Sequence, residues 1–192
     1  MLSIALFHFH VTQIKRSAGQ SAVASAAYRS GEKLHSEYYG EDSDYTKKGG
    51  VICSEILLPP HAPPEYTDRE TLWNAVEKAE RGKKAQLAYS FDIALQNEFS
   101  MQENIELARQ FLLEQFVSRG MVVDFAVHAP DKDDGGISNP HFHVMKRFVK
   151  CFFELLTQII VKVRKCKVQR VCVLHFQLAG SGGCFFLMKL YH

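Results

Sequence analysis

Asn139-Pro140-His141-Phe142-His143-Val144-Met145 is the stretch on which the expected fold depends. Turn residues precede two histidines that stand one residue apart in an apolar run, a pattern typical of the start of a β-strand. Strand side chains alternate between faces, so His141 and His143 would share one face while Phe142 points to the other. Their Cβ atoms would lie roughly 6–7 Å apart. Two imidazoles at that separation can converge on one metal ion. A His-x-His pair without further ligands, however, more often consists of ordinary surface or core histidines.

A third histidine stands just upstream, at the end of the run 121–128. Alternation along this run places His128 on the same face as Asp124, opposite an apolar face. The connection 129–138 is polar and rich in turn residues, so the two runs are expected to form an antiparallel hairpin. Cross-strand neighbours lie about 5 Å apart, which would bring His128 beside the His-x-His pair. Three neutral imidazoles that leave coordination positions open suit a divalent metal that must also hold substrate oxygens.

The length and composition are those of a soluble single-domain protein, with 192 residues of which 46% are hydrophobic and 23% charged. No uncharged run reaches the roughly 18 residues that a membrane span needs. The first residues lack the basic start and the small-residue cleavage site of a signal peptide. The five cysteines are an odd number, which without a secretory signal indicates reduced thiols and a cytoplasmic location.

Strands and helices are expected to alternate before the histidine hairpin. Residue spacing predicts strands over 4–14, 51–58 and 86–95, and helices over 21–30, 67–82 and 100–120. Thr67 with Glu70, and Ser100 with Glu103, match capping boxes at two helix starts. Residues 35–50 are polar and are expected to form a surface loop. The predicted fold class is α+β, a mainly antiparallel central sheet with helices on one face and a polar face open to a ligand.

Further polar groups fall on strand faces. His8 and His10 form a second His-x-His pair in the first strand. An ordinary polar sheet face is the simpler interpretation of this pair, and lining the same site is the alternative. Asp92 lies on the polar face of the strand 86–95, either as a solvated carboxylate or as a partner of the metal site.

Basic and aromatic candidates lie between the first strand and the end of the first helix. Lys15 and Arg16 belong to a glycine-containing turn that could hold a phosphate or simply be solvated. The helix over 21–30 is rich in Ala and Ser, so it can lie close to a neighbouring surface. Tyr28 on this helix is either a packing anchor, which spacing alone favours, or a presented reactive group.

The order of these motifs along the chain is similar to the order found in one protein family. The run Gly19-Gln20-Ser21-Ala22-Val23-Ala24-Ser25-Ala26-Ala27-Tyr28-Arg29, followed downstream by His128 and His141-Phe142-His143, resembles the MobA/MobL family of plasmid mobilisation relaxases. These belong to the His-hydrophobe-His (HUH) endonuclease superfamily, and the resemblance covers residues 1–145 nearly end to end. It implies an HUH relaxase-like fold and metal-dependent, site- and strand-specific DNA nicking and transesterification. The family cuts one strand at an origin of transfer during conjugative mobilisation and stays joined to the 5′ end through phosphotyrosine.

The resemblance also implies roles for single residues. Tyr28 would be the nucleophile, and Asp92 would be the acidic group beside the metal. The implied ligands of a divalent cation, Mg²⁺ or Mn²⁺, are His128, His141 and His143. The candidates for contacts with DNA phosphates are Lys15, Arg16 and Arg29. The implied partners are single-stranded DNA at an origin of transfer and accessory mobilisation and coupling proteins, in a bacterial cytoplasm.

Residues 146–192 differ in character from the rest. All six prolines precede them, whereas they contain four of the five cysteines. Residues 1–145 hold 14 Lys and Arg against 20 Asp and Glu, a net charge of −6, while residues 146–192 hold 9 against 1. We therefore expect a relaxase domain over 1–145, incomplete at its C-terminus, and a frameshifted or fused tail over 146–192. The negative charge of 1–145 means that DNA binding would require a local basic groove.

Two other functions stay open at this point. A catalytically inactive relaxase remnant that only binds DNA would keep the same motifs. A three-histidine metalloenzyme acting on a small molecule would use Tyr28 for structure alone. A covalent protein–DNA adduct at Tyr28 would separate a relaxase from both.

Overall fold

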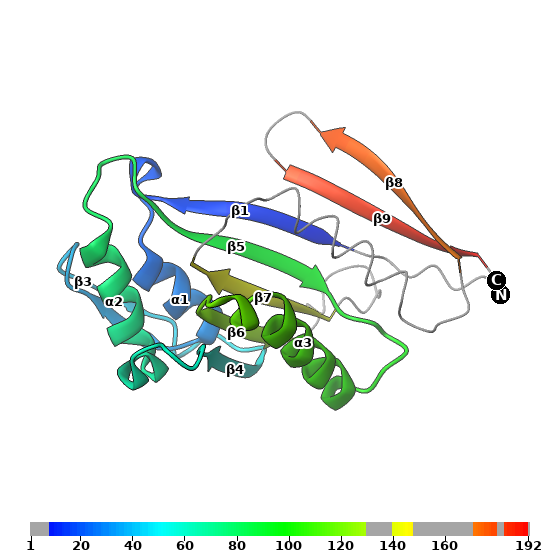
Figure 1. Cartoon of the computed structure of the whole chain (residues 1–192), viewed down its shortest axis with the longest axis horizontal. Helices are drawn as coiled ribbons and strands as arrows, with labels where there is room; N and C mark the ends of the chain where they lie inside the picture. Colours follow the sequence, from blue (N-terminus) through cyan, green and yellow to red (C-terminus); the bar gives the residue numbers. More distant parts are fainter. Residues whose placement is uncertain (1–7, 130–139, 148–170, 180–182, 192) are drawn as a thin grey trace.

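A five-stranded antiparallel sheet forms the centre of the structure (Figure 1). The computed structural model describes residues 8–129, 140–147, 171–179 and 183–191, the last two ranges by their backbone alone. The strands of the central sheet are β1 (Phe9–Lys15), β4 (Val51–Leu57), β5 (Gln86–Ala94), β6 (Val123–His128) and β7 (His141–Lys146). Their order is β1-β5-β7-β6-β4, and every neighbouring pair is antiparallel. The predicted pairing of the two histidine strands, β6 and β7, is confirmed, although residues 130–139 between them lie outside the described ranges.

Within the described ranges, three α-helices accompany the sheet: α1 (Ala22–Ser30), α2 (Arg69–Ala79) and α3 (Met101–Gln115). Ser100 and Glu103 form the predicted capping box at the start of α3. The predicted box at Thr67 is wrong, because Pro64–Thr67 form a 3-10 turn. The helix α2 begins instead after Asp68, whose side chain accepts a hydrogen bond at 2.8 Å from the backbone of the first turn. Aspartate caps a helix at least as well as threonine, so the change costs the helix nothing.

One hydrophobic core lies between the sheet and α3. Phe91, Phe125 and Val144 point to this side from β5, β6 and β7, and each is almost fully buried. They pack with Leu112 of α3 and with Phe116, which follows the helix. These are the apolar positions of the alternating pattern, so the pattern predicts this face correctly.

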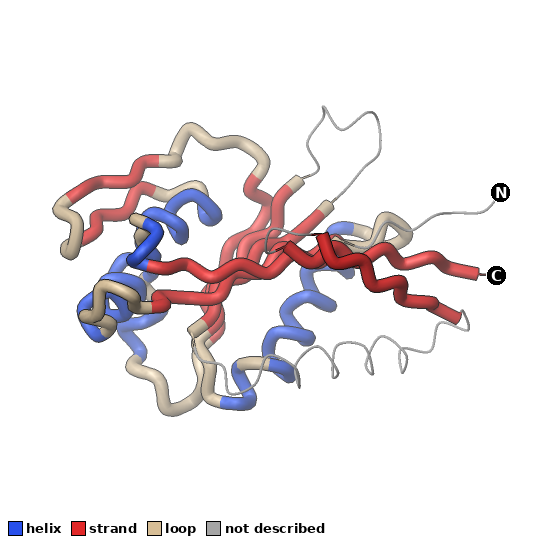
Figure 2. The backbone as a smooth tube through the Cα atoms, turned by 90° about the horizontal axis from the view of Figure 1, so that it is seen from above, coloured by secondary structure: helices blue, strands red, loops and turns tan. Residues whose placement is uncertain are grey.

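A second core forms on the opposite side, where α1 and α2 cover part of the sheet. Trp73 of α2 and the small residues Ala22 and Ala26 of α1 are buried together with Leu87 of β5 and Met145 of β7. Figure 2 shows helices on both sides of the strands. The predicted α+β class and antiparallel sheet are confirmed, and the expectation that the helices share one face is corrected. The reason is that the apolar side of the small-residue helix α1 must itself be buried, and its alanines allow a close approach to the sheet.

Two hairpins outside the central sheet complete the described structure. The expected loop over 35–50 is partly wrong, because β2 (Lys33–Ser36) and β3 (Glu41–Asp44) pair as antiparallel strands there. Within the expected tail, β8 (Val171–Ala179) and β9 (Gly183–Tyr191) pair in the same way. Among the described residues, no helix combines the length and the apolar character that crossing a membrane would require.

Candidate metal centre

Strands β6 and β7 bring three histidines together on the polar side of the sheet. His128 pairs directly with His141 in the antiparallel register, and His143 follows two residues along β7. Their ligand nitrogens all lie within 4.8 Å of one another. The ring centroids are 4.5 Å apart for His128 and His143, and 4.9 Å apart for His141 and His143. The predicted grouping of these three side chains, called the histidine trio below, is therefore confirmed.

Hydrogen bonds fix the orientation of two of the three imidazoles. Nε2 of His128 lies 2.7 Å from the backbone oxygen of Arg29. A carbonyl can only accept, so Nε2 carries the proton and Nδ1 keeps its lone pair for a ligand. Nδ1 of His143 lies 2.5 Å from Oδ1 of Asp92, which leaves Nε2 of that ring free of a proton in the neutral form. Such outer partners are what a metal-binding histidine needs to hold one tautomer and one ring orientation.

The local electrostatics favour a neutral His128 and an ionised Asp92. Burial lowers the pKa of His128 to about 4, against the raising effect of its hydrogen bond to Arg29. His128 is therefore neutral at pH 7, the form that can bind a metal. Burial alone would raise the pKa of Asp92, but the hydrogen bond from His143 and the nearby guanidinium of Arg29 hold it below its ordinary value.

The second His-x-His pair borders the same site. His10 of β1 stands opposite Asp92 of β5 in the sheet register, and its Nδ1 lies 3.5 Å from Oδ2 of Asp92. His8 stacks on His10 with ring centroids 6.3 Å apart. Burial lowers the pKa of His8, and the charges of His10 and His141 add to this while Asp92 opposes it. Of the two interpretations of the pair, the structure favours the alternative, in which these residues line the site.

Tyr28 lies in the last turn of α1, which packs against the histidine trio. The backbone oxygen that His128 contacts belongs to Arg29, the residue that follows Tyr28. Tyr28 is 47% exposed, which suits a presented side chain better than a packing anchor. Its ring meets the ring of Tyr45 edge-on, with centroids 5.2 Å apart. Nζ of Lys48 lies 3.5 Å from the centroid of the Tyr28 ring, a contact that nothing in the sequence pattern predicts because Lys48 stands in a loop without periodicity.

Arg29 joins the helix to the polar face of β5. Its guanidinium donates to the backbone oxygen of Ser25 at 2.8 Å and to Oγ of Ser90 at 2.7 Å. Burial lowers the pKa of Arg29, while the carboxylates of Asp92 and Asp124 oppose that effect. The guanidinium of Arg29 therefore lies near the carboxylate of Asp92 beside the trio, and its expected contact with a DNA phosphate stays a prediction.

The other two candidate phosphate contacts do not join the site. The guanidinium of Arg16 is buried, donates to the backbone oxygens of Glu77 and Glu80, and stacks on the ring of Tyr38 at 3.8 Å. Arg16 therefore satisfies the C-terminal carbonyls of α2, and its expected DNA contact is corrected to this structural role. Lys15 is exposed but lies five residues from His10 along β1, roughly 16 Å from the site at strand spacing.

Known proteins resemble this chain over most of its length. The MobA/MobL family model matches residues 20–150. A probable mobilization protein MobA from Bifidobacterium longum is 34% identical over 142 residues, which cover 74% of this chain and 24% of that protein. A conjugal transfer protein TraA from Rhizobium radiobacter is 38% identical over 152 residues, which cover 74% of this chain and 13% of that protein. The chain thus spans less than a quarter of the length of either relative.

A solved structure supports the same relationship. It is described as "Molecular Basis of Vancomycin Resistance Transfer in Staphylococcus aureus" and superposes with a TM-score of 0.67 at 35% sequence identity. The superposition covers 78% of this chain and 74% of the other. Since the family model also matches more than half of the sequence, the chain belongs to the MobA/MobL family.

Proposed function

We propose that this chain nicks one strand of DNA at a plasmid origin of transfer and joins the 5′ end to Tyr28, as a relaxase of conjugative mobilisation. The observation that carries the proposal is the histidine trio, held by Asp92 on one side and by the backbone of the tyrosine helix on the other. The names of the relatives, which speak of mobilization and conjugal transfer, agree with it.

Tyr28 supplies the nucleophile in this proposal. Its phenol oxygen forms a bond to phosphorus while the bond from phosphorus to the 3′ oxygen breaks. The phenol proton is lost to a base or to water, and the departing 3′ oxygen takes up a proton. The new phosphotyrosine linkage keeps the free energy of the broken phosphodiester, so a second transesterification can rejoin the strand without ATP.

The histidine trio has the donors for a divalent metal. Imidazole nitrogens suit transition metals, whereas Mg²⁺ prefers oxygen ligands, so of the two expected ions Mn²⁺ fits this donor set better. When bound, the cation would offset the negative charge of the scissile phosphate. Asp92 acts as a positioning residue for His143 rather than as a proton acceptor, because its two oxygens face His143 and His10.

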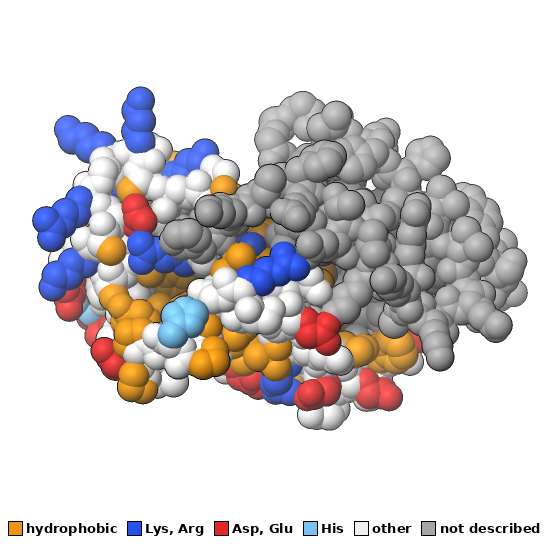
Figure 3. Space-filling model, in the orientation of Figure 1, with side chains coloured by type: hydrophobic (Ala, Val, Ile, Leu, Met, Phe, Trp, Pro, Cys, Tyr) orange, Lys and Arg blue, Asp and Glu red, His pale blue; other side chains and the backbone are white. Residues whose placement is uncertain are grey.

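DNA would reach the site along the basic parts of an otherwise acidic domain. Arg29 provides positive charge beside the trio. Figure 3 shows Lys and Arg side chains gathered at the end of the molecule where β1 finishes and β5 begins. Exposed lysines of that end are Lys15, Lys83 and Lys84. We assign this patch to the DNA backbone away from the cut, in the cytoplasm of a bacterium where accessory mobilisation and coupling proteins would act on the same origin.

We also propose the domain division that the composition suggests. Residues 1–145 form the relaxase domain, incomplete at its C-terminus, and residues 146–192 form a frameshifted or fused tail. The burial of Lys146, the first residue of that tail, supports the division, because a well-packed sheet would carry an apolar side chain there.

A nicking assay tests the proposed function. Supercoiled plasmid that carries the DNA flanking this gene is incubated with the full chain and Mn²⁺, and the products are resolved as relaxed plasmid and as covalent protein–DNA adduct. We expect both products from the natural chain and neither from Tyr28→Phe. Tyr66→Phe, which removes a hydroxyl from a partly buried tyrosine of the second core, is the matched control and should retain both.

The same assay separates the two alternatives. DNA binding without nicking or adduct, in a natural chain that binds Mn²⁺, would favour the inactive remnant. Metal binding without any DNA binding would favour a metalloenzyme for small molecules. A covalent adduct that still forms with Tyr28→Phe would mean that another residue is the nucleophile.

A further inference from the structure

Lys48 contacts the candidate nucleophile in two ways. It lies in the loop before β4, and its Nζ donates a hydrogen bond at 2.8 Å to the backbone oxygen of Tyr28. The same Nζ lies 3.5 Å from the centroid of the Tyr28 ring, well within the range of a cation–π contact. The ring of Tyr45 meets the ring of Tyr28 edge-on, with the ring centroids 5.2 Å apart. One ammonium group therefore holds both the main chain and the aromatic ring of Tyr28.

The loop that carries Lys48 is also tied to the histidine trio. Val51 at the end of this loop pairs with His128 across β4 and β6, and the backbone N–H of Ala129 donates to the oxygen of Gly50 at 2.8 Å. The charge of Lys48 is close enough to contribute to the electrostatic environment of the His128 ring. The loop thus connects the tyrosine at the end of α1 to the metal-binding strand β6.

We propose that Lys48 is a positioning residue for strand cleavage, which sets the orientation of the Tyr28 ring at the edge of the histidine trio. This inference rests on the proposed function of Tyr28. An exposed tyrosine would otherwise sample several rotamers, and in-line attack on phosphorus requires one of them. Lysine suits the task because it offers three donors on a flexible stem, one for the carbonyl and a positive charge for the ring face.

Single-turnover formation of the covalent adduct tests this role. A single-stranded oligonucleotide that contains the cleavage site is mixed with the full chain and Mn²⁺, and the rate is compared among variants. We expect Lys48→Met to slow the adduct about tenfold, from the loss of one partly desolvated cation–π contact. Lys48→Arg should recover most of the rate, because arginine keeps the charge and the donors. Lys47→Met is the matched control, since Lys47 is the adjacent and exposed lysine, and it should react at the natural rate.

A spectroscopic measurement keeps the test independent of nicking. In protein labelled with ring-¹³C tyrosine, the Tyr28 resonance is identified by its loss in Tyr28→Phe. We expect that resonance to shift in Lys48→Met and to stay in place in Lys47→Met. Lys48→Gln, which keeps a donor for the Tyr28 carbonyl without the charge, replaces Lys48→Met if thermal unfolding shows that the latter does not fold.

The two proposals fail in different ways. If the natural chain forms no adduct with any cognate DNA, the proposed function is wrong, and the resonance of Tyr28 alone decides the role of Lys48. If the natural chain forms the adduct and Lys48→Met reacts as fast as Lys47→Met, the positioning role is wrong. An unmoved Tyr28 resonance in Lys48→Met would overturn it as well.

Discussion

At the scale of single residues, Asp92 links the histidine trio to the neighbouring strands. Asp92→Asn keeps the size of the side chain but removes the charge that holds the Nδ1 proton of His143. Loss of such an outer partner typically weakens metal affinity about 10–100-fold, and we expect a loss of that size for Mn²⁺ by isothermal titration calorimetry. Asp42→Asn is the control, because Asp42 also pairs with a histidine, His35, but in the exposed β2–β3 hairpin. Equal affinities in the two variants would contradict the assigned role.

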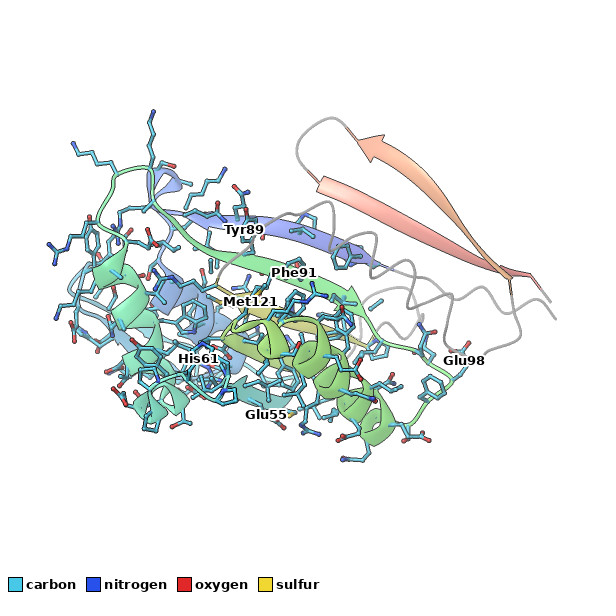
Figure 4. All side chains as sticks on the ribbon, in the orientation of Figure 1. Glu55, His61, Tyr89, Phe91, Glu98 and Met121 are labelled. Carbon is cyan, nitrogen blue, oxygen red and sulfur yellow. The ribbon has the colours of Figure 1, made fainter. Side chains whose placement is uncertain are left out.

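Lys146 is a buried lysine on the apolar side of the sheet. It is fully buried, with Nζ 4.0 Å from the ring centroid of Phe116, 5.1 Å from that of Phe91 and 3.8 Å from Sδ of Met121. Figure 4 labels Phe91 and Met121, which lie near each other between β5 and α3. Burial lowers the pKa of Lys146 from 10.5 to about 7. The folded state therefore favours the neutral amine.

This lowered pKa makes stability depend on pH in a defined direction. Between about pH 7 and 10.5 the unfolded state binds more protons at Lys146 than the folded state does, so the contribution of this group to the free energy of unfolding rises with pH. Lys146→Met should remove that rise and add roughly 4 kcal/mol at pH 7, as measured by urea denaturation across the pH range. Lys78→Met, at an exposed lysine of α2, should do neither. A natural chain whose stability is flat across this window would show that Lys146 stays charged when buried.

Residue spacing predicts much of the site but not its outer partners. The period of two in a strand is enough to place His128, His141 and His143 on one face, and Asp92 on a polar face. It cannot say which strands are neighbours. The contact between His10 and Asp92 depends on the pairing of β1 with β5. From the sequence, therefore, His10 could belong to an ordinary polar sheet face or line the site. Lys48 lies in a loop, where no period applies, and is seen only in the folded chain.

At the scale of secondary-structure elements, α1 is held in place by a buried carboxylate on α2. Glu77 is 1% exposed, and its Oε1 accepts from the backbone N–H of Ala22 at 2.7 Å and from Oγ of Ser21 at 2.8 Å. Its Oε2 accepts from Oγ of Ser36 in β2 at 2.8 Å. A carboxylate at a helix N-terminus is stabilised by the free N–H groups and the helix dipole. Glu77 thus fixes the helix that presents Tyr28.

Glu77→Gln should therefore destabilise the fold. The amide keeps the shape but replaces one acceptor with a donor that faces N–H and O–H groups, so we expect a loss of roughly 2–4 kcal/mol in the free energy of unfolding. Urea denaturation followed by circular dichroism measures it. Glu65→Gln, at an exposed glutamate of the turn before α2, should change stability by less than about 0.5 kcal/mol. Comparable losses in the two variants would mean that the Glu77 contacts contribute little.

Element types are easier to predict than their arrangement. Apolar periodicity and the Ser100 capping box identify the strands and α3, because these signals are local. The side of the sheet on which a helix packs depends on tertiary contacts, and α1 shows this. Its alanines indicate a close approach to some surface, but only the folded structure shows that the surface is the polar side of the sheet beside Met145. The β2–β3 hairpin is missed for a different reason, since its short strands are mostly exposed and carry no apolar pattern.

At the scale of the whole molecule, Lys146 is the first residue whose side chain does not suit its position in the fold. Phe142, Val144 and Lys146 alternate along β7 toward the side that α3 covers, and the first two are apolar, as that core requires. A frame change after codon 145 would replace the following residues without regard to burial. It would also explain the change of charge from −6 over 1–145 to +8 over 146–192.

The nucleotide sequence of the gene tests the hypothesis that a frame change produced residues 146–192. We expect another reading frame, entered just after codon 145, to encode a continuation similar to the MobA and TraA relatives, of which the matched parts cover only 24% and 13%. The same frame should place an apolar residue at position 146, because the register of β7 buries that position between Phe91 and Phe116. Sequencing the gene and its flanks provides the measurement. If no frame offers such a continuation, residues 146–192 belong to the protein. The buried Lys146 is then a residue that the fold tolerates at the cost in stability predicted above.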